Sequence, residues 1–495
     1  MRLIDIIKET GVTDSATADK FRNIDIEDVC TDSRKCRHGS LFIAVKGAAA
    51  DGHKYICNAI DNGAKVILYE NEENIEEYRR DDILFIPVKD GRTAEAIAAK
   101  NFYGDPTSCI KLVGVTGTNG KTSIATLLYR LLGNLGYECG LISTIANYVG
   151  KRRYETINTT PGPVELNRLL AEMVECGCEY CFMEVSSHAL DQKRTEGLKF
   201  AGAIFTNLTH DHLDYHKTFA NYLAAKKKLF DNLDIDAFAL TNEDDKNGSV
   251  MLQNCKARRY GYSCRNAADF KCRIIEKNID GTLLNINGRE IWCRFIGLHN
   301  AYNITAVYGA AVLLGMKEEE VAVEVSRLTA VSGRLEYFKG SNDIIAAVDY
   351  AHTPDALENV LKTLKDLNPA GDLICVFGCG GNRDKTKRPE MGAIAGKYAD
   401  KVVVTSDNPR FEDPLAIIND IKEGMDIKAR CKSSFIPDRQ EAVRVAILNA
   451  KPGSIILVAG KGHEDYQIVN GVKHHLDDKE LIKSAFEELK MLCKA

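Results

Sequence analysis

Short apolar runs alternate with stretches of helical spacing along most of the chain. Near the amino terminus, residues 41–47, 64–70 and 82–88 are apolar runs of strand length, separated by helical patterns. This alternation predicts a small α/β domain. Glycine and proline interrupt it in the segment 101–108, so we expect a domain boundary near residue 107.

A second series begins with an apolar run at 110–115, followed by isoleucine and leucines at helical spacing between 124 and 132. The runs at 181–186 and 201–209 end in polar residues and alternate with helical patterns, as in a parallel sheet covered on both faces. Alternation at 266–296, with Asp-Gly and Asn-Gly pairs, predicts antiparallel hairpins added to this domain. A helical pattern at 300–314 closes the domain.

After residues 331–338, four further apolar runs at 343–350, 373–381, 401–410 and 454–464 lead into Gly, Asp, Arg or His. Ligands of open α/β sheets bind beyond the carboxyl ends of the strands, so a second binding crevice is predicted here. The expected fold is α/β with three domains. They are an N-terminal α/β domain (1–107), a central parallel-sheet domain with a phosphate-binding loop (108–332) and a C-terminal Rossmann-like domain (333–495).

Composition narrows the class of protein. The 495 residues carry a net charge of -5 with mixed signs, so we expect no nucleic-acid partner. No apolar run approaches the ~20 residues that cross a bilayer, and the amino terminus lacks a signal-peptide pattern. We therefore expect a cytoplasmic protein without membrane insertion, whose 16 cysteines are reduced. Cys176, Cys178 and Cys181 lack a partner pair at zinc spacing, which disfavours a metal site there.

The sequence GVTGTNGKTS at 114–123 places a glycine-rich turn where the strand at 110–115 meets a helix. In such a loop, backbone N–H groups and the helix N-terminus bind phosphates, Lys121 reaches the outer oxygens and the Thr122 hydroxyl can hold Mg²⁺. Val115 stands where the general pattern has its first glycine. We predict an ATP site formed by Thr116, Gly117, Thr118, Asn119, Gly120, Lys121 and Thr122.

Two further side chains on neighbouring strands are candidate ligands of Mg²⁺. Glu184 ends one central strand and His212 follows the next. With Thr122 they offer a hydroxyl, a carboxylate and an imidazole, although Mg²⁺ prefers oxygen. From the residues alone, His212 is equally compatible with a hydrogen-bonded structural histidine. The neighbouring His210 and His216 leave the choice within this cluster open.

The chain resembles the Mur ligases in a series of motifs that occur in the order found in that family: GTNGKT, NTTPG, EVSSHAL, NLTHDHLDYH, GLHNAYN, DYAHTPDAL, CGGNRDKTKRP, DNPR and GKGHE. The resemblance extends from TDSR at 31–34 to LDDKE at 476–480. It implies an enzyme that joins a diamino acid to UDP-N-acetylmuramoyl-L-alanyl-D-glutamate in peptidoglycan synthesis. In this family ATP phosphorylates the D-glutamate side chain, and the amine then displaces phosphate from the acyl phosphate.

By this resemblance the catalytic residues are Lys121, Glu184, His212 and Lys226, and the metal ligands are Thr122, Glu184, His212 and Lys226. Lys226 aligns with the lysine that Mur ligases carry as a carbamate. Addition of CO₂ would turn its cation into an anionic oxygen ligand, which suits Mg²⁺. From the residues alone, a solvated lysine on a helix face would be favoured instead.

The resemblance also implies a set of residues for the UDP-linked muramoyl dipeptide: Ser33, Ala48, Ala49, Ala50, Asn158, Thr159, Thr160, Ser186, Gln192 and Arg194. Without the family, Arg194 is equally compatible with an exposed arginine at a helix end. For the nucleotide it implies His299, Asn303 and Arg334 in addition to the phosphate loop: His299 and Asn303 should lie near the adenine, and Arg334 at the hinge between domains. Ser332 replaces a proline found in many Mur ligases, so we expect a less rigid hinge.

The third domain should select the amino acid. In the family, the motif formed by Asp407, Asn408, Pro409 and Arg410 accompanies meso-diaminopimelate addition. Arg383 and Arg410 would hold the carboxylate that lysine lacks, and Gly460 and Glu464 would bind the other end. Since losing a hydrogen bond to a charge costs about 1.5–3 kcal/mol, lysine should be a poor substrate. Asn382 replaces a common aspartate, which puts the local geometry beside Arg383 in question.

Three alternatives remain open from the sequence. The first is a family member that adds L-lysine, and the second is a relative of folylpolyglutamate synthase, which the DNPR and TDSR motifs disfavour. The third is a nucleotide-binding module without ligase activity. The combination of carboxylate-binding motifs with the carbamate-type lysine argues against this last class.

Overall fold

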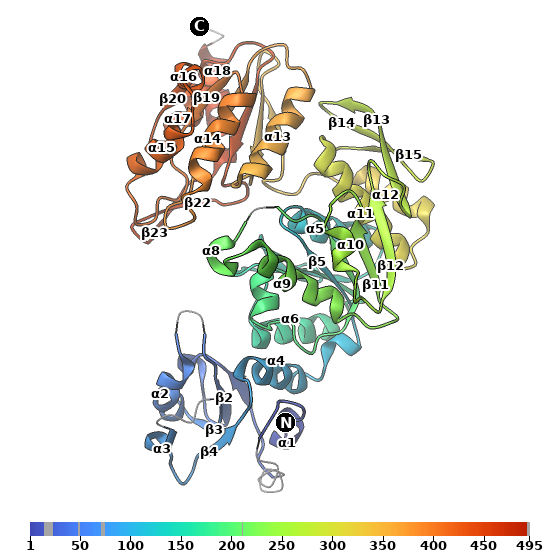
Figure 1. The fold of residues 1–495 in the computed structure, drawn as a ribbon, viewed down its shortest axis with the longest axis vertical. Coiled ribbons are helices and arrows are strands. Elements are labelled where there is room, and N and C mark those ends of the chain that lie inside the picture. Colours follow the sequence, from blue (N-terminus) through green and yellow to red (C-terminus); the bar gives the residue numbers. More distant parts are fainter. Residues whose placement is uncertain (14–22, 48–49, 71–74, 210, 493–495) are drawn as a thin grey trace.

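The structure is a computed structural model that describes residues 1–13, 23–47, 50–70, 75–209 and 211–492. Ala48, Ala49 and His210, named above from the sequence, lie outside the described residues. Three α/β units follow one another along the long axis of the molecule, with the first at the lower end of Figure 1 and the third at the upper end. The predicted α/β class is confirmed, and parallel strands form the centre of each unit.

The first unit contains a parallel sheet of order β1-β2-β3-β4. Its strands are β1 (Asp28–Cys30), β2 (Ser40–Ala44), β3 (Ala64–Tyr69) and β4 (Leu84–Pro87), and its helices are α1 (Leu3–Ile6), α2 (Ile56–Asp61), α3 (Ile75–Tyr78) and α4 (Gly91–Phe102). Along β2, Leu41 and Ile43 pack toward α4 whereas Phe42 packs toward α2. The three predicted strands are confirmed, and β1 is added at the edge.

The central unit is built on a long sheet of order β15-β14-β13-β12-β11-β10-β5-β9-β6-β7-β8. The strands are β5 (Lys111–Thr116), β6 (Cys139–Ile142), β7 (Asn147–Val149), β8 (Arg152–Tyr154), β9 (Tyr180–Glu184), β10 (Phe200–Phe205), β11 (Phe238–Asn242), β12 (Arg258–Ser263), β13 (Phe270–Asn278), β14 (Gly281–Ile286) and β15 (Arg289–Cys293). Pairing is parallel from β6 to β13 and antiparallel in the outer hairpins.

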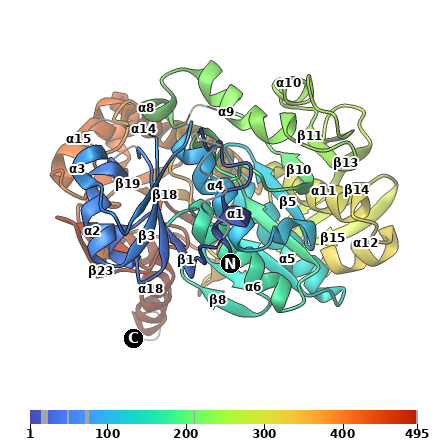
Figure 2. The ribbon, with the colours of Figure 1, turned by 90° about the horizontal axis from the view of Figure 1, so that it is seen from below.

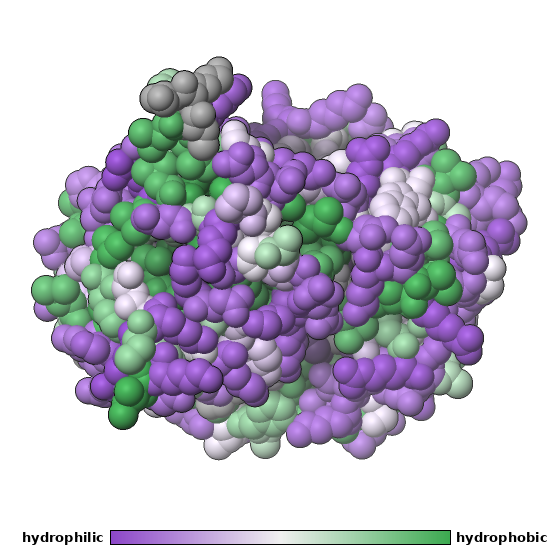
Figure 3. All heavy atoms as spheres, turned by 90° about the horizontal axis from the view of Figure 1, so that it is seen from above, coloured by the Kyte–Doolittle hydropathy of each residue, from purple (hydrophilic) through white to green (hydrophobic). Residues whose placement is uncertain are grey.

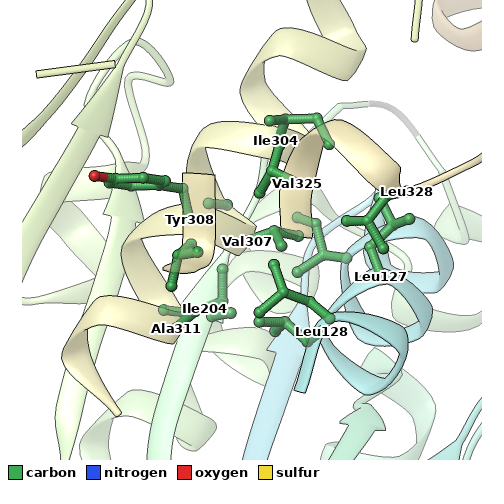
Figure 4. Close-up of a cluster of buried hydrophobic side chains, with 14 of the residues drawn as sticks. Leu127, Leu128, Ile204, Ile304, Val307, Tyr308, Ala311, Val325 and Leu328 are labelled. Carbon is green, nitrogen blue, oxygen red and sulfur yellow. The ribbon is translucent and has the colours of Figure 1, made fainter. Parts of the chain in front are cut away.

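Helices cover both faces of this sheet, as predicted. On β5, Val113 and Val115 face α5 (Lys121–Asn134) and α11 (Leu298–Leu313). Leu112 faces the opposite side, where α6 (Pro163–Glu175), α7 (Ser187–Asp191) and α9 (Phe219–Asp231) lie. Figure 4 shows how leucines of α5 interlock with aliphatic side chains of α11 and with α12 (Glu318–Arg327) over β10. Two buried faces explain why these strands are apolar throughout.

The predicted hairpins at 266–296 are confirmed as β13, β14 and β15, which pair antiparallel. Between β14 and β15, Asn287 has φ 49° and Gly288 has φ 88°. Positive φ at both central residues defines the tight turn that Asn-Gly favours. In Figure 1 this extension rises beside the third unit, near α13 (Pro354–Asp366).

The third unit has a sheet of order β16-β17-β21-β18-β19-β20 in which only β16 runs antiparallel within the described residues. Its strands are β16 (Glu336–Lys339), β17 (Ile345–Asp349), β18 (Leu373–Phe377), β19 (Lys401–Val404), β20 (Ser433–Phe435) and β21 (Ile455–Ala459). One face is covered by α13, α14 (Lys387–Tyr398), α15 (Pro414–Glu423) and α16 (Ile427–Cys431), and the other by α17 (Arg439–Leu448) and α18 (Asp478–Leu492). The four predicted strands are confirmed.

The sequence patterns missed several short strands. The hairpin β22 (Tyr466–Val469) and β23 (Val472–His475) is half-buried or exposed, and its strands of four residues are too short for a clear apolar pattern. Its local signal is the turn Asn470-Gly471, whose φ values of 49° and 80° are those that Asn-Gly favours in hairpins. Short helices also escaped: α8 (Leu213–His216) and α10 (Gly248–Met251). The conformation of elements this short depends on contacts with the loops and sheets that surround them.

Two further views relate the units. Seen from the first unit's end, α4 lies beside the central unit, where it packs against α6 (Figure 2). Seen from the opposite end, hydrophilic residues predominate, and hydrophobic residues show in the gaps between them (Figure 3). None of the helices in the described part of the chain has the length and apolar character needed to span a bilayer.

Candidate active site

The loop between β5 and α5 has the backbone geometry of a phosphate-binding turn. Gly117 has φ 148°, and a Cβ there would lie 1.8 Å from Thr206 Oγ1, so the position requires glycine. Gly120, with φ 91°, is the N-cap of α5, so the first N–H groups of the helix face the loop. Lys121 Nζ donates to the carbonyls of Gly117 and Thr118 at 2.9 and 2.7 Å. A helix N-terminus and an ammonium thus meet at one turn, as anion binding requires.

Two loop threonines hold this turn against the rest of the unit. Thr116 Oγ1 donates to the Val185 carbonyl at 2.9 Å. Thr118 Oγ1 lies 3.1 Å from the hydroxyl of Tyr222 on α9. Both side chains are buried, so their hydroxyls fix the loop rather than face solvent.

A buried carboxylate lies beside the first turn of α5. Glu184 is fully buried, and its Oε2 accepts a hydrogen bond from Thr122 Oγ1 at 3.0 Å. Thr144 donates to the same carboxylate through its backbone N at 2.8 Å and its Oγ1 at 3.2 Å. Arg334 Nη2 reaches Thr122 Oγ1 at 3.1 Å. The structure therefore brings two predicted metal ligands together and adds Thr144, for which the sequence held no signal.

Lys226 on α9 is buried, with 1% of its surface exposed. Its Nζ donates to the Gly117 carbonyl at 2.8 Å and lies 4.7 Å from the centre of the Tyr222 ring. Desolvation lowers the pKa of this amine well below its usual value, and the nearby Lys121 lowers it further. The solvated lysine face favoured by the residues alone is thus wrong for Lys226, which points inward to the phosphate loop.

The histidines of this region occupy different environments. His216 is buried, and its Nε2 lies 3.0 Å from Ser187 Oγ, as expected for a structural histidine. His212 is more exposed, and its Nε2 lies 3.3 Å from Asp211 Oδ2. Desolvation raises the pKa of Asp211, but electrostatic interactions with His212, His352 and the cations Lys121 and Lys387 outweigh it and leave this pKa below its usual value. Asp211 is therefore an anion near the phosphate loop that the sequence analysis missed, although it lies inside the quoted motif NLTHDHLDYH.

A cavity of about 420 Å³ lies between the phosphate loop and the third unit. Five residues predicted for the nucleotide line it: Asn119, Gly120, His299, Asn303 and Arg334. The third unit contributes Tyr350, His352 and Asp355 to its wall. This volume falls in the range of small-ligand sites.

Polar groups at this cavity connect the two units. Asn119 Nδ2 donates to Asp355 Oδ2 at 3.0 Å, and the Arg334 guanidinium lies 4.6 Å from the centre of the Tyr350 ring. Within the described residues, His299 Nδ1 and Arg334 Nε are buried without a hydrogen-bond partner. Burial lowers the pKa of His299 to about 4. Unpaired buried polar atoms aimed at a cavity are typical of ligand-binding positions.

Most residues predicted for the dipeptide form a hydrogen-bonded group that begins at the backbone carbonyl of Glu184. Thr160 Oγ1 donates to the Glu184 carbonyl at 2.8 Å and accepts from Ser186 N at 3.1 Å. Arg194 Nη1 donates to the Thr160 carbonyl at 2.7 Å, and Nη2 to Gln192 Oε1 at 2.7 Å. Arg194 is thus held in a network and is not an exposed helix-end arginine. Thr159 joins this group through Thr144 Oγ1, whereas Asn158 is exposed.

The first-unit residues stand apart from this group. Ser33 is buried in a turn of the first unit, and Ala50 is exposed. Lys193 of the central unit makes a polar contact with the first unit: its Nζ donates to Asp90 Oδ2 at 2.8 Å and to Thr93 Oγ1 at 2.9 Å. Beside it, desolvation raises the pKa of Glu95 to about 7 despite the charge of Arg194. These contacts join separate units and therefore leave no signal in the local sequence.

The predicted acceptor residues lie together on loops of the third unit. Asn408 Nδ2 donates to Glu464 Oε2 at 2.8 Å, and a Cβ on Gly460 would lie 2.5 Å from Asp407 Oδ2. Arg410 has φ 55°, and its Nη1 donates to the Gly381 carbonyl at 2.8 Å. Pro409 completes this loop.

Arg383 is exposed on the neighbouring loop after β18. A Cβ at Gly380 would lie 2.9 Å from Arg410 Nη1 and 3.8 Å from Arg383 Cγ, so the two arginines flank this glycine. Asn382 has φ 53° and its Oδ1 accepts from Phe411 N at 3.1 Å. Asparagine tolerates this backbone conformation, so it is well suited to the position. Neither arginine is among the residues that line the 420 Å³ cavity.

Comparison with known proteins decides the family. The model "Mur ligase family, catalytic domain" matches residues 25–103, "Mur ligase middle domain" matches 115–311 and "Mur ligase, glutamate ligase domain" matches 333–462. A Bacteroides thetaiotaomicron protein named UDP-N-acetylmuramoyl-L-alanyl-D-glutamate–2,6-diaminopimelate ligase is 54% identical over 464 residues, which are 94% of this chain and 96% of that protein. The chain belongs to the Mur ligase family.

Other Mur ligases agree over nearly the full length. A Cytophaga hutchinsonii protein of the same name is 49% identical, covering 98% of both chains. Among solved structures, a 2,6-diaminopimelate ligase of this name is 31% identical, with a TM-score of 0.67, and covers 95% of this chain and 96% of its own. MurF from Acinetobacter baumannii, 18% identical, has a TM-score of 0.66 over 95% of each chain and shows the shared fold alone.

Proposed function

We propose that this Mur ligase uses ATP to join meso-diaminopimelate to the D-glutamate side chain of UDP-N-acetylmuramoyl-L-alanyl-D-glutamate. The observation that carries the proposal is the buried Thr122–Glu184 pair at the first turn of the phosphate-loop helix. It occurs in a chain whose relatives at 49–54% identity are named 2,6-diaminopimelate ligases. A cytoplasmic location is part of the proposal.

Binding of ATP is assigned to the phosphate loop and the 420 Å³ cavity beside it. The N–H groups at the start of α5 would hold the phosphates, and Lys121 would exchange its two carbonyl partners for phosphate oxygens. His299 and Asn303 would contact the adenine side. Arg334 is placed to respond to the nucleotide because it touches both Thr122 and Tyr350.

The donor set around Thr122 fits a hard cation. Thr122 and Glu184 present buried oxygens 3.0 Å apart, and carbamylation of Lys226 would add a third oxygen ligand. The lowered pKa of the Lys226 amine supports this step, because only a neutral amine adds to CO₂. His212 completes the proposed set. No arrangement of three or more His, Cys, Asp or Glu side chains in the described ranges forms a metal site, so the hydroxyl and the carbamate are essential to the assignment. Mg²⁺ held there would neutralise phosphate oxygens during transfer.

The two organic substrates are assigned to opposite sides of this centre. Ser33 and residues 48–50 would hold the nucleotide-sugar end, and Thr159, Thr160, Ser186, Gln192 and Arg194 the dipeptide. The D-glutamate carboxylate oxygen would attack the terminal phosphorus of ATP, with ADP leaving. The acceptor amine would then attack the acyl carbon, releasing phosphate. Arg383, Asp407, Asn408, Arg410, Gly460 and Glu464 would hold the acceptor.

The test is acceptor-dependent ADP formation with ATP, Mg²⁺ and the UDP-linked dipeptide, using meso-diaminopimelate or L-lysine. Faster turnover with meso-diaminopimelate, and a product heavier by one diaminopimelate residue, is expected. Faster turnover with lysine would make the chain a lysine-adding ligase. Nucleotide binding without substrate-dependent phosphate release would support the non-catalytic module instead.

A further inference from the structure

The third unit contains an ion pair that is entirely removed from solvent. Arg439 and Asp478 each have side chains that are 0% exposed. Arg439 Nε donates to Asp478 Oδ1 and Nη2 to Asp478 Oδ2, both at 2.7 Å. This two-pronged geometry is the strong form of an arginine–carboxylate contact. None of the motifs used above for substrate binding contains Arg439.

The same guanidinium also binds two backbone carbonyls. Nη1 donates to Ser406 O at 3.2 Å, and Nη2 donates to Ala459 O at 3.0 Å. Ser406 is followed directly by the segment 407–410, and Ala459 by the segment 460–464. We call these segments the acceptor loops. One side chain therefore joins the starting points of both.

The spacing between the acceptor loops has little tolerance. Asn408 of one loop donates to Glu464 of the other at 2.8 Å. Gly460 has φ 114°, and a Cβ there would lie 2.5 Å from Asp407 Oδ2, so the carboxylate of one loop lies directly against the glycine Cα of the other. A change in the separation of the loops would alter both contacts at once. Holding the two carbonyls at fixed positions therefore has direct consequences for the proposed acceptor groups.

The location of this pair is unfavourable by simple electrostatics. Arg439 is the first residue of α17, where the helix dipole disfavours a cation. Burying two ions also requires the removal of water from both, and an apolar pair of similar volume is often no less stable. Arginine is suited here for another reason: its five donors can bind one carboxylate and two carbonyls together.

We propose that Arg439, fixed by Asp478, is a positioning residue that sets the separation of the two acceptor loops and thereby the affinity for the acceptor amino acid. This inference rests on the proposed function, because it assumes that the acceptor binds at these loops. Arg439 itself touches no substrate. Its influence passes through the carbonyls of Ser406 and Ala459 to Asp407, Asn408, Gly460 and Glu464.

The test compares matched pairs of variants in the full-length protein. In the first, Arg439→Met is combined with Asp478→Leu, which removes both buried charges together and leaves neither unpaired. The control combines Arg444→Met with Glu488→Leu. Arg444 and Glu488 join the same two helices by a similar two-pronged contact, at 2.8 and 2.7 Å, but they are partly exposed and contact neither acceptor loop. Arg439→Lys, which keeps the charge but cannot bind both carbonyls, is the third variant.

Two measurements decide the outcome. We expect the KM for meso-diaminopimelate to rise about 10- to 100-fold in the Arg439 variants, because small displacements of binding groups have effects of this size. The KM values for ATP and for the UDP-linked dipeptide should stay near those of the wild type. Hydrogen exchange should quicken about tenfold at the acceptor loops, with no change in the core strands of the sheet. The control should change neither quantity.

An unchanged acceptor KM in a folded Arg439→Lys or double variant would overturn the inference, as would unchanged exchange at the acceptor loops. A lower melting temperature with only kcat reduced would show a purely structural role, which also contradicts it. If the double variant does not fold, Arg439→Lys alone decides between these outcomes by the same measurements. Absence of acceptor-dependent turnover in the wild type would instead refute the proposed function, and hydrogen exchange would still decide whether Arg439 holds the loops.

Discussion

Beside the phosphate loop, Thr122 and Thr144 both donate hydrogen bonds to the carboxylate of Glu184 within one unit. The acceptor side chains of the third unit, in contrast, lie on three separate loops. Glu184 is the last residue of β9, and its hydrogen bonds to Thr122 in the first turn of α5 and to Thr144 after β6 fix the distances of these groups. Among the acceptor groups, Gly460 directly follows β21, whereas Glu464, Arg410 and Arg383 lie farther along the loops after β21, β19 and β18. Their positions depend on contacts between loops, including the buried Arg439.

Because of this difference, we expect substitutions in the two regions to affect activity in different ways. Buried groups bonded within one sheet form a rigid set, and loss of one member removes charge from a site that cannot rearrange. Loop groups can adjust, so loss of one should weaken binding of one substrate and spare the others. The contacts between the two units include polar pairs, such as Asn119 with Asp355, and apolar packing of Ile296 and Ile279 against the core of the third unit.

The largest effect is expected for Lys121→Ala, which removes the ammonium from the phosphate loop. Because this cation would stabilise charge on the transferring phosphate, kcat should fall about 1000-fold, whichever acceptor is used. Steady-state ADP formation measures this. Lys111→Ala, on the exposed start of β5, is the control and should retain activity. A rise in the KM for the acceptor with an unchanged kcat would contradict the division between the two regions.

Lys226→Ala should reduce kcat about 100-fold or more, since it removes a proposed anionic ligand from a buried site. Depletion of bicarbonate should lower the wild-type rate, and a short carboxylic acid such as propionate should partly restore the variant by supplying the missing carboxylate. Lys228→Ala, on the same helix but ion-paired with Asp191 at the surface, is the matched control. A fully active Lys226→Ala enzyme would remove this lysine from the mechanism.

Arg410→Ala should raise the KM for meso-diaminopimelate about 10- to 100-fold, because a charged hydrogen bond worth about 1.5–3 kcal/mol is lost. The low activity with lysine should change little, since lysine has no carboxylate at that end. Comparing kcat/KM for both amino acids in wild type and variant gives the loss of discrimination. An equal loss with both acceptors would show that Arg410 shapes the loop and does not recognise the carboxylate.

The smallest effect concerns stability in acid. Burial lowers the pKa of His299 from 6.5 to about 4, so between these values the unfolded chain binds a proton that the folded chain does not. The free energy of unfolding therefore falls as pH falls through this window, by about 2 kcal/mol at about pH 5. His299→Asn should lose less stability than the wild type between about pH 7 and about pH 5 in thermal melts. The exposed His474→Asn is the control, and an unchanged acid sensitivity in His299→Asn would contradict the assignment.

Much of the fold was predictable because buried strands leave a plain apolar signal. The strands β2, β3, β4, β5, β9, β10, β17, β18, β19 and β21 all coincide with predicted runs, and β2, β5, β9 and β10 extend one residue beyond them. Short exposed elements such as the β22–β23 hairpin were missed, because strands of four residues with little buried surface have too weak an apolar pattern. The domain boundaries near 107 and 332 and the roles of the individual site residues stay predictions.

The site was predictable only where its residues lie in motifs. The phosphate loop and Glu184 were predicted from the sequence, whereas Thr144 was not, because it lies in no motif and reaches Glu184 from the loop after β6. Asp355 lies inside the motif DYAHTPDAL, but only the packing of the two units shows that it accepts a hydrogen bond from Asn119. Lys226 shows the limit most clearly. Its neighbours Lys227 and Lys228 form ion pairs with Asp231 and Asp191, and nothing in the local sequence tells which of the three points inward.

The sequence by itself determined the class of fold, the family and the residue types available for phosphate and carboxylate binding, because these follow from local periodicity and from motifs. The tertiary structure alone decided which groups meet. Burial of Lys226 against Gly117, the Thr144 contacts to Glu184 and the clasp of Arg439 on two loops all join residues far apart in the chain. Such contacts depend on how the strands are ordered in a sheet, and strand order leaves no local signal.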